Sequence, residues 1–86
     1  MPEVSRFYGI VIRMYWLDHP LPHFHADYAG ESASIHIGTG KVIAGRLPRR
    51  ALRMVRQWES MRRDDLLANW ELVRAKEPLN PVDPLP

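Results

Sequence analysis

Apolar and polar residues alternate along the first half of the chain, which is the pattern of half-buried β-strands. Residues 7–16 are rich in aromatic and β-branched types and predict one strand with its even positions on an apolar face. Residues 23–28 and 32–37 alternate in the same way on either side of Gly30. A second turn at residues 38–40 leads into a further strand. We therefore expect four antiparallel strands in meander order.

The glycine turns decide how these strands pair. A loop at residues 30–31 sets His25 opposite His36, whereas a loop at residues 29–30 sets His23 opposite His36. Either register keeps the three histidines on one face of the sheet, because side chains alternate along a strand. A glycine bulge in the following turn brings two more apolar residues to the core face: Ile43 and Leu47.

From Pro48 onward the apolar residues follow a helical period. Pro48 opens a first helix, because its missing N–H costs nothing in the first turn. The spacing predicts a buried stripe of five residues: Ala51, Leu52, Val55, Trp58 and Met61. Asp64 and Asp65 begin a second helix, where acidic side chains match the helix dipole. Its inward side is predicted to consist of Leu66, Leu67, Trp70 and Val73.

These elements together predict an α+β fold, an antiparallel four-stranded meander followed by two helices packed on one face. We expect a single domain over residues 1–77. Residues 78–86 hold four prolines and predict an extended tail, for which fraying is favoured over the alternative of packing against the body.

The composition of the 86 residues excludes several classes of protein. The chain has no cysteine, which excludes disulfide scaffolds, cysteine-ligated zinc, iron–sulfur clusters and thiol nucleophiles. The apolar run near the N-terminus is far too short to cross a membrane, and residues 1–3 lack the basic region of a signal peptide. We therefore expect a cytoplasmic protein.

The net charge of +2 conceals a strongly cationic segment. Residues 46–63 hold seven arginines and a single acidic residue, Glu59. The guanidinium fork suits phosphate and carboxylate groups, so the predicted ligand is RNA or an acidic partner protein. An arginine face that serves solubility is the alternative. Five arginines on or beside one helix face form the candidate anion site: Arg46, Arg49, Arg50, Arg53 and Arg56.

The histidines cluster in the first half of the chain: His19, His23, His25 and His36. His23 and His25 are alternate strand residues about 6.5–7 Å apart, so they form a candidate site for a divalent metal ion with Asp27, or alternatively His36, as the third ligand. Without a metal, His23, His25 and His36 are candidate acid–base catalysts. The alternative is a half-exposed sheet face that merely tolerates histidine.

Aromatic residues supply a third candidate feature. Phe7 and Tyr15 take the polar-side phase of the first predicted strand and are candidates for stacking on bases. Core packing is the better explanation for most of the other aromatic residues.

Four motifs are spread over nearly the whole chain. They are SRFYGIVI at residues 5–12, PHFH at 22–25, LP at 47–48 and NWE at 69–71. Together they resemble the small bacterial domain-of-unknown-function family 4160 (DUF4160). The resemblance implies a protein without an established activity, encoded in a two-gene operon beside another small domain of unknown function, as in a toxin–antitoxin pair.

The chain departs from the family pattern at two places. Leu21-Pro22 stands where the family usually has two adjacent prolines, and Arg62 stands where it often has a histidine. A site that used this histidine would be incomplete in this chain.

The leading hypothesis is a component of a toxin–antitoxin-like module that binds RNA or an acidic partner protein through the arginine helix. The expected partner is the product of a neighbouring gene. A homodimer is compatible with so thin a core, which leaves strand edges to cover. The alternative function is a small ribonuclease or metal-dependent hydrolase that uses the strand histidines. A third interpretation is a purely structural module that neutralises an acidic companion.

Overall fold

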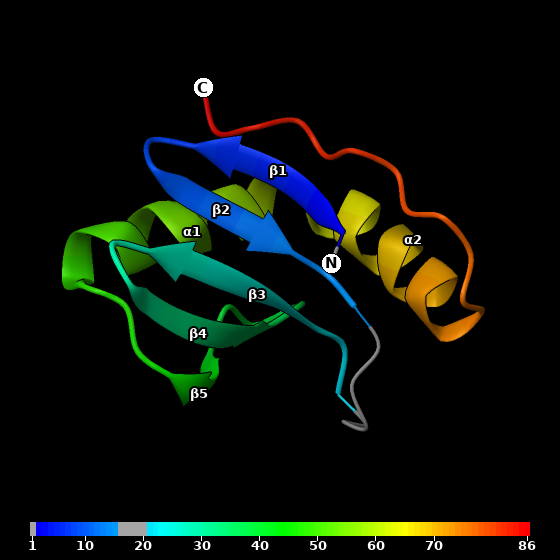
Figure 1. The fold of residues 1–86 in the computed structure, drawn as a ribbon, viewed down its shortest axis with the longest axis horizontal. Coiled ribbons are helices and arrows are strands. Elements are labelled where there is room, and N and C mark those ends of the chain that lie inside the picture. Colours follow the sequence, from blue (N-terminus) through cyan, green and yellow to red (C-terminus); the bar gives the residue numbers. More distant parts are fainter. Residues whose placement is uncertain (1, 16–20) are drawn as a thin grey trace.

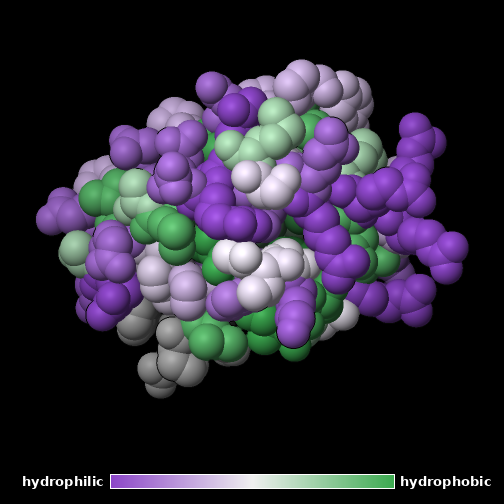
Figure 2. Space-filling view, turned by 180° about the vertical axis from the view of Figure 1, so that it is seen from behind, coloured by the Kyte–Doolittle hydropathy of each residue, from purple (hydrophilic) through white to green (hydrophobic). Residues whose placement is uncertain are grey.

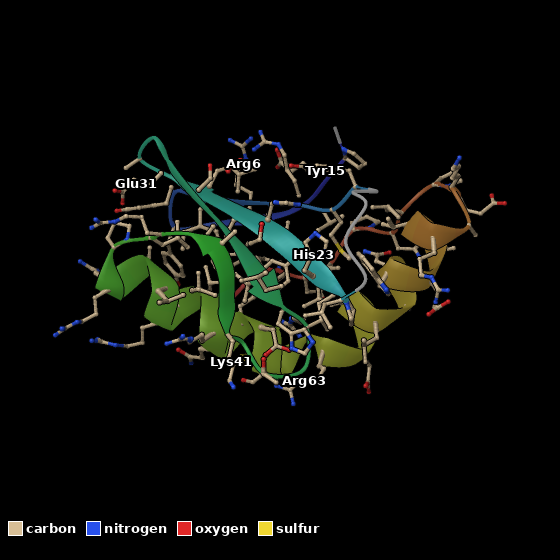
Figure 3. The ribbon with its side chains drawn as sticks, turned by 90° about the horizontal axis from the view of Figure 1, so that it is seen from below. Arg6, Tyr15, His23, Glu31, Lys41 and Arg63 are labelled. Atoms are coloured by element: carbon tan, nitrogen blue, oxygen red, sulfur yellow. The ribbon has the colours of Figure 1, made fainter. Side chains whose placement is uncertain are left out.

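A computed structural model describes residues 2–15 and 21–86 and shows an antiparallel sheet with two helices (Figure 1). The strands are β1 (Glu3–Phe7), β2 (Ile10–Arg13), β3 (His23–Tyr28), β4 (Glu31–His36) and β5 (Val42–Gly45), and they pair in chain order. The helices are α1 (Arg49–Met61) and α2 (Arg63–Arg74). Seen from below, α1 and α2 follow one another along the same side of the sheet (Figure 3).

The sheet has five strands rather than the predicted four, because the chain reverses at Tyr8 and Gly9. These residues have positive φ angles of 49° and 81°, as expected for a tight two-residue hairpin turn. Residues 7–16 therefore do not form one strand, since β2 begins after this turn. Ile10 and Ile12 are buried as predicted, whereas Tyr8 is exposed at the turn.

Between β3 and β4 the two-residue loop falls at Ala29 and Gly30. His23 consequently lies opposite His36, which confirms the second of the two predicted registers. The φ angles of Ala29 and Gly30 are 50° and 82°, so this turn repeats the geometry of the turn between β1 and β2. The apolar phase of the two strands is buried, as its alternation predicted: Phe24, Ala26, Ala33 and Ile35.

The pairing of β5 with β4 is interrupted by a bulge. Val42 packs against the core here instead of the predicted Ile43, while Leu47 is buried as predicted. This pairing requires a residue without a side chain at position 45, which is Gly45. It has a φ of 75°, and an added Cβ would collide with the Ser32 carbonyl oxygen.

Helix α1 begins directly after Pro48, as predicted, and places Trp58 in the core. The Trp58 ring centroid lies 5.3 Å from that of Phe7 and 5.5 Å from that of Phe24. Two apolar residues that were predicted to face inward are exposed: Met61 and Leu67. Two polar residues are buried in the helices instead: Glu59 and Asn69. Within the described ranges, neither helix is long and apolar enough to cross a membrane.

The proline-rich tail is packed, so the prediction of a frayed tail is wrong. Val82 and Leu85 are buried, and the Val82 N–H donates to the Val4 carbonyl oxygen at 2.8 Å. The side chain of Asn69 donates to the backbone of Asn80 at 2.8 Å and accepts from it at 3.0 Å. The tail therefore runs back along the outer edge of β1, where Figure 1 shows the C-terminal segment (red) beside that strand.

Candidate functional site

The outward side of α1 and the segment before it carry five exposed arginines, which we call the arginine surface: Arg46, Arg49, Arg50, Arg53 and Arg56. Helix α1 buries Ala51, Val55 and Trp58. Because a helix turns by 3.6 residues, this burial directs the arginine positions to the opposite side. In Figure 2, which views the molecule from behind, strongly hydrophilic side chains project from the side on which α1 begins.

Most of these guanidinium groups have no acidic partner in the part of the chain that the structure describes. Arg46 lies 3.6 Å from the Glu31 carboxylate, and Arg56 donates through Nε to the Gly40 carbonyl oxygen at 2.9 Å. The guanidinium groups of three arginines make no hydrogen bond or ion pair with any described residue: Arg49, Arg50 and Arg53. The positive charge of the surface is therefore largely uncompensated among these residues.

The first turn of α1 is an unfavourable place for cations. It contains no acidic residue, and Pro48 at its N-cap provides no side-chain hydrogen bond. The positive end of the helix dipole lies here, so Arg49 and Arg50 are repelled by it as well as by each other. An anion bound to this surface would relieve both repulsions.

The two remaining arginines of the cationic segment stabilise the fold. Arg63 donates through Nε and Nη2 to the Glu59 carboxylate at 2.9 and 3.0 Å. Arg62 donates to the carbonyl oxygens of Asp83 and Pro84 at 3.1 and 3.0 Å. Arg62 therefore anchors the tail through its side chain.

His23 is a core residue. Its side chain belongs to the buried set (3% exposed), and its Nδ1 donates to the Leu21 carbonyl oxygen at 2.8 Å. Its ring centroid lies 5.2 Å from that of Trp70 in α2. Trp70 of α2 therefore packs against His23, whose side chain is almost completely shielded from solvent.

His25, in β3, is half-buried and in contact with an aromatic ring. Its ring stacks on Tyr15 at a centroid distance of 4.4 Å, and its Nδ1 lies 3.2 Å from Ser34 Oγ. Its Nε2 is buried and has no hydrogen-bond partner among residues 2–15 and 21–86. Burial lowers the pKa of His25, and the neighbouring His23 lowers it further, against an opposing effect of Asp27. Both effects favour the neutral ring, which tolerates an unpaired nitrogen better than a charged ring does.

His36 and Asp27 form hydrogen bonds elsewhere. His36 Nδ1 lies 2.8 Å from Thr39 Oγ1 in the turn after β4. Asp27 pairs with Arg13 and accepts a hydrogen bond from Ser32 at 2.6 Å. Asp27 is therefore held in a polar network on the sheet.

Two of the predicted metal ligands, His23 and His25, lie together with their ring centroids 5.1 Å apart, but no third ligand joins them among the described residues. Across residues 2–15 and 21–86, no three His, Asp or Glu side chains are arranged to hold a metal ion. The set of His23, His25 and Asp27 is therefore not formed as a three-ligand site, and His19 lies outside the described residues. The catalytic roles of His23, His25 and His36 stay predictions, and the burial of His23 gives them no support.

The aromatic residues that reach the surface differ in part from those that the sequence predicted. Phe7 is buried against Trp58, so the prediction that it stacks on bases is wrong. Tyr15 is half-buried and one face of its ring stacks on His25, so its stacking on bases stays a prediction. Tyr8, which the sequence placed on the apolar face, is the exposed aromatic side chain of the described chain. Gly9 beside it was the signal for a turn at this position.

The fold and its surface define a small α+β domain with an antiparallel sheet and an arginine-bearing helix. Residues 9–71 match the model of the family described as Domain of unknown function (DUF4160). The chain therefore belongs to this family, as its motifs indicated. Comparisons with curated proteins and with solved structures gave no significant match.

Proposed function

We propose that this protein binds RNA through the arginine surface. The observation that carries the proposal is the state of Arg49, Arg50 and Arg53, which are exposed and have no carboxylate partner within the described ranges. A cluster of cations without internal partners is the usual electrostatic mark of an anionic ligand.

The geometry of the helix suits a row of phosphates. Arg49 and Arg53 are four residues apart, which corresponds to about 6 Å along a helix axis. Each guanidinium group offers several N–H donors in one plane and can bind a phosphate through two of them. Neighbouring arginines can therefore contact successive phosphates of one strand.

The composition of this face favours RNA over an acidic protein. The exposed positions that continue it along α1 are Gln57 and Ser60, which are polar, and Met61 at the C-terminal end of the helix, away from the arginines of the first turn. Stable protein interfaces have a buried apolar or aromatic centre, which this face does not provide. Contacts to a phosphate backbone require only charge and hydrogen-bond donors.

The biological setting is part of the same proposal. The family resemblance implies one half of a toxin–antitoxin-like two-gene module, with the product of the neighbouring gene as partner. RNA binding in the cytoplasm is the role that we propose for this chain within such a module. The hydrolytic alternative finds no comparable support, since the strand histidines are buried or hydrogen-bonded to other parts of the fold.

A salt titration tests the proposal. Binding of a labelled mixed-sequence RNA is measured by fluorescence anisotropy for the natural chain and for the triple variant Arg49→Gln/Arg50→Gln/Arg53→Gln. Each phosphate contact contributes about −0.7 to the slope of log K against log salt for a single strand, so the variant should lose about 2 from this slope. Its affinity at low salt should fall strongly.

A control variant removes equal charge from other surfaces: Arg6→Gln/Arg74→Gln/Lys76→Gln. All three side chains are exposed and lie outside α1. This control should keep most of the affinity and nearly the natural slope. Absence of RNA binding at low salt, or equal losses in the two triple variants, would refute the proposal; in the first case, binding of an acidic partner protein becomes the explanation to test.

A further inference from the structure

Tyr8 is exposed at the tip of the hairpin between β1 and β2. Its side chain is 61% exposed, and it makes no ring contact or hydrogen bond with any residue that the structure describes. Its neighbour Phe7 points inward and packs on Trp58. The hairpin therefore uses one aromatic residue for the core and leaves the next one free on the surface.

The backbone at Tyr8 is one that an aromatic residue rarely adopts. Its φ of 49° lies in the left-handed region, which favours glycine and asparagine in a turn of this kind. Glycine follows at position 9 with a φ of 81°. A strained aromatic side chain on the surface, at a position where asparagine would be more stable, points to a role in binding.

The tip that carries Tyr8 lies at the same end of the sheet as the start of α1. The turn between β1 and β2 and the turn between β3 and β4 are both at this end (Figures 1 and 3). Strand β5 also ends here and leads through Arg46 into Arg49 and Arg50. An exposed aromatic ring and the unpaired arginines are therefore presented at one end of the molecule.

We infer that Tyr8 stacks on an unpaired base, so that the protein binds single-stranded RNA in preference to a duplex. The inference rests on the proposed function, because the arginine surface holds the phosphates of the same strand. A ring and a row of cations are the two components of single-strand binding sites. A continuous duplex keeps its bases stacked inside the helix and offers none of their faces to Tyr8.

The test compares Tyr8→Asn with Tyr8→Phe and uses one labelled mixed-sequence RNA strand, alone and annealed to its complement. Asparagine accepts the left-handed backbone, so the fold is kept while the ring is lost. Loss of one stacked base should weaken single-strand binding by about tenfold or more and leave duplex binding unchanged. Tyr8→Phe should bind like the natural chain.

Ala29→Asn is the matched control. It introduces asparagine into the other hairpin turn, at a φ of 50°, without removing an aromatic ring, and should bind RNA normally. Equal single-strand affinity for Tyr8→Asn and Ala29→Asn would overturn the inference, and so would equal affinity of the natural chain for single strand and duplex. In both cases a loss of binding in the triple arginine variant would leave the proposed function standing. Absence of any RNA binding at low salt would remove both.

Discussion

Glu59 joins three segments of the fold, and its substitution tests how much this junction contributes to stability. The carboxylate is 1% exposed and accepts hydrogen bonds from the Gly38 N–H at 2.9 Å and from Arg63 Nε and Nη2 at 2.9 and 3.0 Å. It therefore connects α1 to the turn before β5 and to the start of α2. Glu59→Gln keeps the shape of the side chain but removes the charge and directs an amide N–H₂ at the guanidinium group.

The magnitude follows from the three contacts. The amide oxygen of glutamine can still accept from Gly38, so the main loss is the pair with Arg63. Breaking a buried ion pair typically costs about 3–5 kcal/mol. The Arg63 side chain is 41% exposed and can be hydrated when its partner is lost, which reduces this cost. We expect Glu59→Gln to lower the free energy of unfolding by about 2 kcal/mol, which for a domain of this size lowers Tm by about 8–16 °C.

Thermal and urea unfolding followed by circular dichroism measure this loss at neutral pH. Glu71→Gln is the control, because the pair of Glu71 with Arg74 is exposed and has an N–O distance of 3.4 Å. An exposed pair contributes little, so this control should change the free energy of unfolding by less than about 0.5 kcal/mol. If Glu59→Gln is as stable as the control, the junction does not stabilise the fold.

Acid should remove the difference between the natural chain and Glu59→Gln. Burial by itself would raise the pKa of Glu59, but the hydrogen bonds from Arg63 and Gly38 and the nearby charges of Arg63 and His36 outweigh it and hold the pKa below its ordinary value of 4.5. A carboxylate with a lowered pKa in the folded state stabilises the fold above the unfolded value. That contribution disappears as the pH falls through the folded value. A stability gap that persists unchanged in acid would refute this explanation.

Two further predictions concern the sheet and the tail. Because the pKa of His25 is below its ordinary value of 6.5 in the fold, the unfolded chain takes up a proton first, and stability should fall as the pH drops below about 6.5. His25→Phe, which keeps an aromatic ring for stacking, should reduce this dependence in urea unfolding measured at several pH values, and an unchanged slope would contradict the prediction. Deletion of residues 81–86 removes buried Val82 and Leu85 and should cost about 4 kcal/mol, at roughly 2 kcal/mol for each side chain. A truncated chain with nearly the natural Tm would show that the tail does not stabilise the domain.

Local patterns were sufficient for much of the fold. The alternation in β3 and β4 predicted their buried faces, because the side-chain period of a strand is a property of the backbone itself. Pro48 predicted the start of α1 because a proline restricts the backbone at its own position, whatever the rest of the fold does. Of the two turns that share the same geometry, the β3–β4 turn was predicted at Gly30, whereas the β1–β2 turn was missed. Tyr8 takes the position where asparagine is usual, so the β1–β2 turn looked like the interior of a strand.

The buried polar residues could not be predicted, because their partners lie far away in the sequence. Glu59 is buried with the N–H of Gly38, and Asn69 is buried with the backbone of Asn80. Each of them is two residues away in the sequence from an apolar residue that was predicted to face inward and is exposed, Met61 in α1 and Leu67 in α2. A helical period indicates which side of a helix is apolar on average. Which individual residues of that side are buried depends on the segments that pack against the helix.

The amino-acid sequence by itself determined the α+β class, the common side of the strand histidines and the arginine face of α1, since all three follow from the periods of strands and helices. Only the tertiary structure decided which of these groups reach solvent. Helix α2 buries His23 through Trp70, whereas the described part of the chain brings no carboxylate to Arg49, Arg50 or Arg53. The physical reason is that exposure depends on contacts between segments distant in sequence, which no local period specifies.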